Sequence, residues 1–464
     1  MVKYSCERCG KEFSQKSHYD SHKRRKKPCE NYADKMKQLV DKAVEDKFKE
    51  LHYKSFIVDK KTTTISSKHS DLSYKLTKQI CKDIKKKQGI YFTPPNTIQT
   101  NLQYLEPYMD TIKDVLEPSC GSCEYILALN NRYPHCNITG IEYNNTIFNS
   151  IKPFSNDNIS IIQDDFLTYK NTLKYDLIIG NPPFFVMKKK GVHSSYYKYF
   201  NGRPNIFIIF ILKSLEYLKD NGILSFILPK SFLNCLYYNK TRKYINDSCN
   251  IINIIECHDK YIETKQETII FIIQKKKLTN EPFIIEINDF LIFGTPINIT
   301  YLKSLYSGSK SLYELGYKVK VGTIVWNQCK TLLTDNHTKT RLIYSSDIVN
   351  KKLTIKKYAN IKKKNYIDKK GISGPLLVIN RGYGVGNYKF EYCLIDEDFE
   401  YLIENHLICI NYTKSITNSE LVKQYTQIIK SFNNKNTKKF IDLYFGNNAI
   451  NTTEINYILP IYDS

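Results

Sequence analysis

Short apolar runs rich in Ile, Leu and Val alternate with amphipathic segments between Gly89 and Lys277. Each run has the length of a buried strand, and "NIFIIFILKSLEYLKDNG" has apolar residues at helical spacing with an Asn221-Gly222 stop. This alternation predicts an α/β fold with a doubly wound parallel sheet, in which ligands bind beyond the carboxyl ends of the strands. We expect the strands in "DVLEP", "NITGIEY", "ISIIQDDF", "YDLIIGN", "GILSFILP", "IINIIECH" and "ETIIFIIQ".

The strand candidate "YDLIIG" runs directly into "NPPFF", residues 181–185. Two prolines cannot donate hydrogen bonds in a sheet, and they disfavour helix in the residues before them. The chain after Gly180 is therefore expected to form a rigid extended turn with Asn181 at its mouth. Such a turn at the end of a buried strand predicts a functional site.

Three other strand candidates end in polar or small residues. The loop "LEPSCGSCEYI" lets backbone approach a ligand but lacks the three-glycine spacing of a dinucleotide cradle. Glu142, about twenty residues later, is placed to accept the hydroxyls of a ribose. Asp164, Asp165 and Phe166 close the next strand, where a carboxylate accepts from an adenine amino group and a ring stacks on it. These features favour S-adenosylmethionine over a nicotinamide cofactor.

Taken together, the motifs resemble the DNA methyltransferases that modify the exocyclic amino group of adenine, in the TaqI-like (gamma) order. "GIYFTPP", "LEPSCGSCE", "GIEYN", "QDDFL" and "NPPF" follow in that family's sequence, over roughly residues 85–277 and more loosely to the C-terminus. The resemblance implies a Rossmann-like S-adenosylmethionine-dependent fold acting on duplex DNA, in a restriction-modification role with room for a companion endonuclease. One departure is Cys123, where the family usually has glycine.

The resemblance also implies roles for individual residues. In the catalytic turn, the side-chain carbonyl of Asn181 and the backbone carbonyl of Pro182 accept the amino hydrogens of a flipped-out adenine. Pro183 stiffens the turn, and Phe184 stacks on the base. The cofactor is expected to contact Thr93, Pro94, Glu117, Pro118, Ser119, Cys120, Gly121, Glu142, Asp165 and Phe166.

Other functions remain open at this stage. Some RNA methyltransferases and the glutamine methyltransferases acting on release factors share the Asn-Pro-Pro-aromatic tetrapeptide, so it does not name the substrate alone. A DNA-binding factor that has lost methyl transfer is a further alternative. The formal charge of +23, from 69 Lys and Arg against 46 acids, supports a nucleic-acid partner. Because AT-rich coding also inflates Lys, the charge is supporting evidence only.

The first thirty residues resemble a Cys₂His₂ zinc finger, with two close cysteines, spaced aromatic residues and a histidine on an expected helix. The second histidine of the family is missing at the usual spacing, and Cys29 follows instead behind Pro28. We expect a Cys₂HisCys zinc site, with the pair His18 and His22 as a competing choice. The finger binds either DNA or a protein. The expected ligands are Cys6, Cys9, His22 and Cys29.

The rest of the chain divides into a basic helical linker over 31–88, a catalytic domain over 89–277, and an α+β target-recognition domain over 278–464. The basic, aromatic loop 186–205 either grips DNA or is merely solvated. The resemblance implies a second stacking ring near the end of the last core strand, where Phe271 is the only aromatic; the register could instead place Ile273 there, and a buried core role is the favoured interpretation of Phe271. The DNA-binding candidates are Lys188, Tyr196, Phe271, Trp326, Asn327 and Arg381.

The 13 scattered cysteines and the charged first residues favour an intracellular location in cytoplasm or nucleus, in a virus or a bacterium. No apolar run approaches the roughly 18 residues that would span a membrane.

Overall fold

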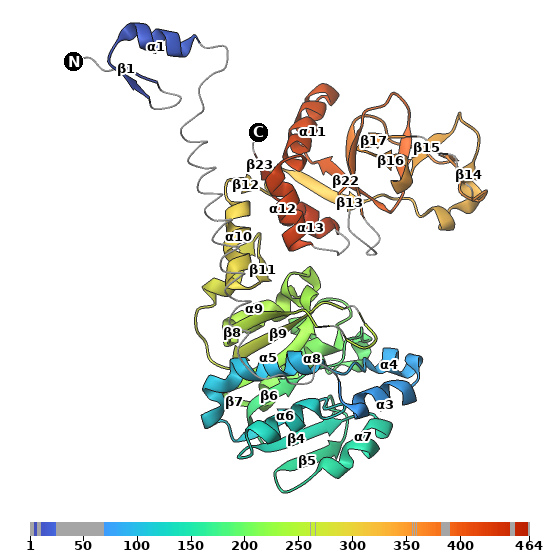
Figure 1. The fold of residues 1–464 in the computed structure, drawn as a ribbon. Coiled ribbons are helices and arrows are strands. Elements are labelled where there is room, and N and C mark those ends of the chain that lie inside the picture. Colours follow the sequence, from blue (N-terminus) through green and yellow to red (C-terminus); the bar gives the residue numbers. More distant parts are fainter. Residues whose placement is uncertain are drawn as a thin grey trace. The chain divides into compact units, whose positions relative to one another are not determined.

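The computed structural model describes residues 4–6, 11–24, 69–259, 261–264, 266–354, 356, 358, 360–381, 390–445 and 451–462. The chain forms two compact units, Met1–Ser66 and Ser67–Ser464 (Figure 1). In the first, β1 (Tyr4–Ser5) pairs antiparallel with β2 (Glu12–Phe13), and α1 (Lys16–Lys23) follows. This is the ββα order that the zinc-finger prediction requires.

Seven strands of the second unit form one sheet in the order β5-β4-β3-β6-β7-β9-β8 (Figure 1). The first five of these are parallel, whereas β9 runs antiparallel to both of its neighbours. The sequence analysis predicted a wholly parallel sheet. The edge differs because no described helix crosses over between β8 and β9, so the chain returns antiparallel. The strands are β3 (Asp114–Glu117), β4 (Asn137–Glu142), β5 (Ile159–Gln163), β6 (Tyr175–Gly180), β7 (Leu218–Pro229), β8 (Asn250–Cys257) and β9 (Thr268–Gln274).

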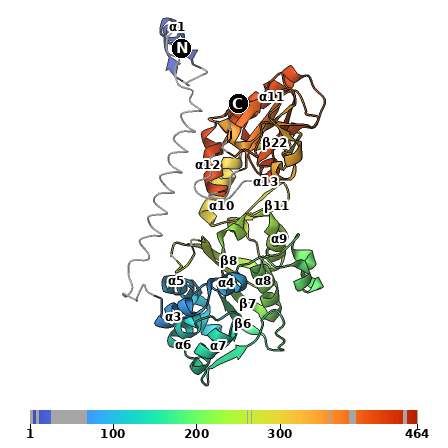
Figure 2. The same cartoon turned by 90° about the vertical axis from the view of Figure 1, so that its right-hand side faces the viewer.

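Helices cover both faces of this sheet (Figures 1 and 2). Alternation along β6 shows why, because Leu177 and Ile179 join one hydrophobic cluster while Ile178 joins the other. The helices are α3 (Asp71–Gln79), α4 (Lys82–Gln88), α5 (Pro95–Leu105), α6 (Glu124–Arg132), α7 (Asn145–Ile151), α8 (Ile206–Tyr217) and α9 (Asn239–Ser248). α8 is buried along its whole length except at Glu216. It ends before the predicted Asn221-Gly222 stop because β7 already begins at Leu218.

The linker assignment of residues 69–88 differs from the structure. This segment forms two helices, α3 and α4, which are separated at Ile80, where the backbone becomes extended. Leu76 and Ile80 are buried in the core of the α/β domain, and Ser73 Oγ donates to Ser122 Oγ at 2.8 Å. These helices therefore belong to the catalytic domain, and its boundary lies earlier than residue 89.

The C-terminal part contains the expected mixture of short strands and helices. Its main sheet has the order β13-β22-β19-β20 and packs against α10, α11, α12 and α13. The helices are α10 (Pro296–Tyr306), α11 (Asn418–Phe432), α12 (Lys435–Tyr444) and α13 (Thr452–Tyr457). The strands are β10 (Ile284–Ile287), β11 (Phe290–Phe293), β12 (Ser309–Lys310), β13 (Tyr317–Val321), β14 (Leu333–Thr334), β15 (Thr340–Ile343), β16 (Ile348–Val349), β17 (Lys352–Leu353), β18 (Tyr366–Ile367), β19 (Leu376–Asn380), β20 (Tyr392–Ile395), β21 (Tyr401–Ile403), β22 (Leu407–Tyr412) and β23 (Ile461–Tyr462).

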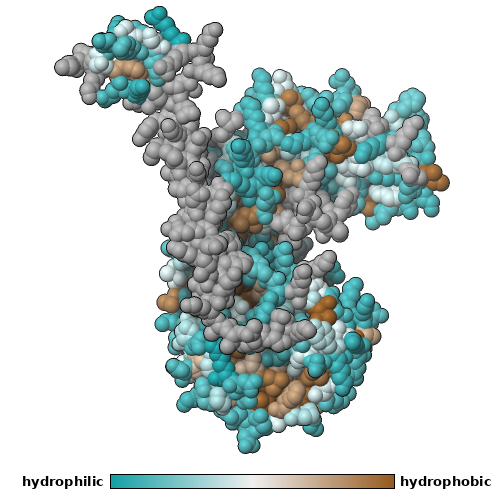
Figure 3. Space-filling model, viewed as in Figure 1, coloured by the Kyte–Doolittle hydropathy of each residue, from teal (hydrophilic) through white to brown (hydrophobic). Residues whose placement is uncertain are grey.

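The surface in Figure 3 is mostly hydrophilic, with smaller apolar patches between the polar side chains. Across the part of the chain that the structure describes, every helix is too short or too polar to cross a membrane.

Candidate active site

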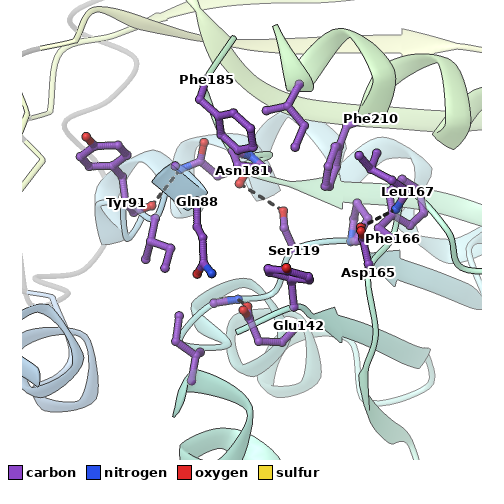
Figure 4. A pocket seen from close by; sticks show the side chains of 18 of the residues that line it. Gln88, Tyr91, Ser119, Glu142, Asp165, Phe166, Leu167, Asn181, Phe185 and Phe210 are labelled. Carbon is purple, nitrogen blue, oxygen red and sulfur yellow. Dashed lines mark hydrogen bonds between the residues drawn. The ribbon is translucent and has the colours of Figure 1, made fainter. Parts of the chain in front are cut away.

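A cavity of about 300 Å³ lies beyond the carboxyl ends of four adjacent parallel strands, β5, β4, β3 and β6 (Figure 4). This is where ligands bind in open α/β sheets. The cavity combines backbone from the loop after β3, carboxylates after β4 and β5, and the turn after β6. It is lined by Lys87, Gln88, Gly89, Ile90, Tyr91, Phe92, Pro118, Ser119, Gly121, Glu142, Tyr143, Ile147, Asp164, Asp165, Phe166, Leu167, Asn181, Pro183, Phe185, Met187, Ile206 and Phe210.

The two ends of the Asn181 side-chain amide differ in their hydrogen bonds: Nδ2 has partners and Oδ1 has none. Its Nδ2 donates to the Tyr91 backbone carbonyl and to Thr93 Oγ1, both at 3.2 Å. Because a backbone carbonyl can only accept, this contact fixes Nδ2 as the donor end of the amide and leaves Oδ1 as its acceptor end. Asn181 Oδ1 is buried and has no partner. An unpaired buried acceptor costs about 1–3 kcal/mol, so the structure holds an oxygen ready for a donor that a ligand supplies.

The turn that carries Asn181 packs tightly against Glu117 and Gly89. Gly180 has a φ of +149°, which favours glycine, and a side chain there would meet Glu117 Cγ at 3.2 Å. Gly89 has a φ of +67°, and a Cβ on it would lie 2.8 Å from both Phe184 N and Pro183 Cβ. Backbone contact with Gly89 thus holds the proline turn in place. The sequence analysis missed this contact.

Glu142 is 7% exposed and holds the neighbouring loops together. Its Oε2 accepts from Gly121 N at 2.9 Å, and its Oε1 accepts from Asn144 N at 2.7 Å. Burial raises the pKa of Glu142 to about 7, although these backbone donors oppose the shift. Tyr143 follows it at the cavity and is 60% exposed, so its ring is available for stacking. The sequence analysis did not single out Tyr143.

The loop after β5 contributes Asp165 and Phe166 to the cavity. Asp165 Oδ1 accepts from Leu167 N at 2.9 Å. The Phe166 ring is buried, with its centroid 5.0 Å from that of Phe210, so only part of it reaches the cavity. Lys213, also missed from sequence, donates from Nζ to the carbonyl of Leu167 at 2.8 Å and thereby holds the loop.

Six of the predicted cofactor and catalytic residues lie beside the cavity and do not line it. Thr93 Oγ1 accepts a hydrogen bond from the Asn181 side chain. Burial, and then the nearby Cys123 and Glu142, raise the pKa of the Glu117 carboxyl well above its usual range. Phe184 packs edge-on against Phe207, while its neighbour Phe185 faces the cavity. The six are Thr93, Pro94, Glu117, Cys120, Pro182 and Phe184.

Two of the DNA-binding candidates, Phe271 and Tyr196, have their side chains in the core. Phe271 is 0% exposed and stacks on Phe293 with the ring centroids 5.9 Å apart. It belongs to the interior strand β9, and both its ring and the alternative Ile273 are buried in the hydrophobic cluster that also contains α8. Tyr196 is buried in the same cluster.

The other DNA-binding candidates lie at the surface or near it. Lys188, Asn327 and Arg381 are exposed, and Trp326 is half-buried against the cluster around Tyr344.

The finger is described in part. Cys6 and His22 are both buried, and the rings of Phe13 and His22 lie 4.9 Å apart. Cys9 and Cys29 lie outside the described residues. Among those that are described, no group of three or more potential ligands comes together.

Residues 123–262 match the protein family described as Eco57I restriction-modification methylase. The Type II methyltransferase M.CvrRI of Paramecium bursaria Chlorella virus XZ-6E is 27% identical over 404 residues, which cover 84% of this chain and 98% of that protein. The modification methylase CviBIII of Paramecium bursaria Chlorella virus NC1A is 36% identical over 171 residues, which cover 36% of this chain and 45% of that protein.

Among solved structures, the DrdV–DNA complex matches with a TM-score of 0.47 at 11% identity, covering 80% of this chain and 55% of that one. These two viral relatives are named as a Type II methyltransferase and a modification methylase, and the prediction of a DNA methyltransferase is confirmed.

Proposed function

We propose that this chain is a site-specific DNA methyltransferase that transfers a methyl group from S-adenosylmethionine to the exocyclic amino group of a flipped-out adenine. Relatives named Type II methyltransferases and modification methylases support a DNA methyltransferase. The order of motifs along the chain, with "NPPF" after the cofactor motifs, supports the TaqI-like class. Duplex DNA is the proposed partner, and a companion endonuclease fits the same role.

One observation carries the adenine assignment: the buried, unpaired Oδ1 of Asn181. The amino group of adenine is a donor of two hydrogens, and its lone pair is delocalised into the ring. An acceptor at a rigid corner binds one of these hydrogens, and we assign the second to the backbone carbonyl of Pro182. Both contacts favour a pyramidal nitrogen whose lone pair can attack, and no strong base is needed.

The cavity has groups that suit the cofactor. The Gly121 backbone lines the cavity with no side chain in the way, so a ligand can come close to it. Glu142, which accepts from Gly121 N, lines the same cavity. Glu142 would bind the ribose, while Asp165 and the rings of Tyr143 and Phe166 would hold the adenine. When bound, S-adenosylmethionine supplies an electrophilic methyl group.

The flipped base needs an aromatic surface as well as an acceptor. Phe185 lines the cavity beside Asn181, as Figure 4 shows, whereas Phe184 does not line it. We therefore assign the stacking role to Phe185, a contact worth about 1–3 kcal/mol.

The substrate class is tested by incubating the protein with methyl-labelled cofactor and, separately, duplex DNA, RNA and a glutamine-bearing release factor. Label on adenine in DNA alone is expected. Label on RNA or on glutamine instead would replace the proposal by one of the two alternative methyltransferases. Cofactor binding with no label on any substrate would favour a DNA-binding factor that has lost transfer.

We also propose that the N-terminal unit binds one zinc ion through Cys6, Cys9, His22 and Cys29. The ββα order and the buried positions of Cys6 and His22 support this, because a tetrahedral zinc site replaces the core that such a short segment lacks. Metal analysis should find about one zinc per chain, lost in Cys29→Ala and kept in His18→Ala. The opposite pattern would move the fourth ligand to His18.

A further inference from the structure

The loop after β3 contains the sequence "CGSC", so Cys120 and Cys123 have the Cys-x-x-Cys spacing of redox-active dithiols. Cys123 is the N-cap residue of α6, and redox-active Cys-x-x-Cys motifs also lie at the start of a helix. The proposed methyl transfer uses neither sulfur. The pair therefore needs a separate explanation.

The geometry of the loop brings the two cysteines together. Cys123 N donates to Cys120 O at 2.8 Å and closes a four-residue turn, in which Gly121 has a φ of +51°. Such a turn keeps its end Cα atoms within about 7 Å, and disulfides need about 4.4–6.8 Å. Cys120 is 4% exposed and Cys123 is 0% exposed, so both thiols are buried at the two ends of this turn. Cys136, by contrast, is a buried thiol that donates to the Ile112 carbonyl.

We propose that Cys120 and Cys123 form a reversible disulfide when the protein meets a peroxide, and that this disulfide weakens cofactor binding. The thiolate of one cysteine attacks a peroxide oxygen, the O–O bond breaks, and a sulfenic acid and water result. The second sulfur then attacks the first, the S–O bond breaks, and another water leaves. The two thiols lose two electrons, and the peroxide is reduced to two waters.

The thiolate that starts this reaction is scarce at neutral pH. The hydrogen bond from Cys123, burial, and the nearby Glu142 and Glu117 all raise the pKa of Cys120 well above its usual range. The pair is therefore expected to react more slowly than an exposed cysteine of low pKa, and to respond to sustained rather than brief oxidation.

The effect on the cofactor follows from the neighbours of Cys120. Ser119 and Gly121, on either side of it, both line the cavity. Gly121 N donates to Glu142 Oε2, and Ser119 Oγ donates to the Asn181 backbone carbonyl at 3.2 Å. Bringing the two sulfurs to the bonding distance of about 2.05 Å pulls Cys120 toward α6 and displaces both neighbours. This half of the inference rests on the proposed cofactor site, whereas the disulfide itself does not.

The test uses the full-length protein treated with hydrogen peroxide. Free thiols are then alkylated, the protein is digested, and the peptides are weighed. The peptide with both cysteines should be unalkylated and about 2 Da lighter than its reduced form, and dithiothreitol should restore it. Calorimetry should show the Kd for S-adenosylmethionine rising about tenfold on oxidation and returning on reduction.

Two variants remove the dithiol, Cys123→Gly and Cys123→Ser, and the glycine suits the φ of +62° at this position. Both should bind cofactor equally well before and after peroxide, while the control Cys136→Ser should respond like the wild type. Full alkylation of both cysteines after peroxide, or equal loss of binding in the Cys123 variants, would overturn the proposal. A disulfide with unchanged Kd would refute its regulatory half. If reduced wild-type protein fails to bind the cofactor, the failure is that of the proposed function.

Discussion

Gly89→Ala tests whether the segment before the first strand of the sheet holds the catalytic turn. Gly89 caps α4 with a φ of +67°, and an added Cβ would lie 2.8 Å from Phe184 N and Pro183 Cβ. Neither neighbour is the free end of a flexible side chain. The added methyl group must therefore displace the backbone of the turn or the end of α4.

The cost has two parts. An L-residue with positive φ costs about 1–2 kcal/mol, and overpacking against fixed atoms costs about 1–3 kcal/mol more. Gly202 is the matched control, because its φ is +62° and nothing lies within 4 Å of its Cβ position. Gly202→Ala should therefore show the first part alone, and the difference between the variants is the contact with the turn.

Urea titrations and single-turnover methyl transfer measure both effects. Gly89→Ala should lose about 2–5 kcal/mol of unfolding free energy, and its transfer rate should fall at least tenfold, because small misplacements of reacting groups are costly. Gly202→Ala should lose about 1–2 kcal/mol and keep its rate. If the two variants match in stability and in rate, the turn does not depend on Gly89.

Further predictions concern single side chains. Thr93→Val removes one acceptor from the catalytic amide, so transfer should slow about tenfold while unfolding free energy changes by under about 2 kcal/mol; an unchanged rate would remove Thr93 from the account. Because burial raises the pKa of Glu142 in the folded protein to about 7, the protonated side chain stabilises the fold fully below about pH 4.5, and this stabilisation is lost as the pH rises through 7. In urea titrations between about pH 5 and 8, the unfolding free energy of Glu142→Gln should lack this decline. Phe271→Ala should cost about 3–5 kcal/mol of stability, whereas an exposed ring would cost little. Phe185→Ala should raise the KM for DNA more than Phe184→Ala does, and equal effects would argue against the stacking assignment.

The positions of the proline turn and of Glu142 were predictable because local chemistry determines them. Two prolines constrain the chain whatever its surroundings, and a carboxylate that closes a strand must lie at the ligand edge of a parallel sheet. Asn181 and Glu142 accordingly line the cavity as expected. The seven strands of the main sheet were also identified, since each contains a short apolar run.

Other features depend on contacts between distant segments, which periodicity does not reveal. Gly89 meets the turn about ninety residues later, and Lys213 reaches the carbonyl of Leu167 from α8. In the sequence, Phe271 is an aromatic residue near the end of a strand, which made it a candidate to stack on a base. However, β9 lies inside the sheet, and the ring is in the core. The break at Ile80 is likewise decided by packing, because both halves are good helix formers.

The central claim is that the unpaired Oδ1 of Asn181 accepts a hydrogen of the adenine amino group. Its most direct test is the single-turnover rate of N6-methyladenine formation in duplex DNA by wild-type protein and by Asn181→Ala, with cofactor saturating both. The account predicts a loss of about 100–1000-fold, as expected when one oriented polar contact to the reacting group is removed. Equal rates for the two proteins would contradict it.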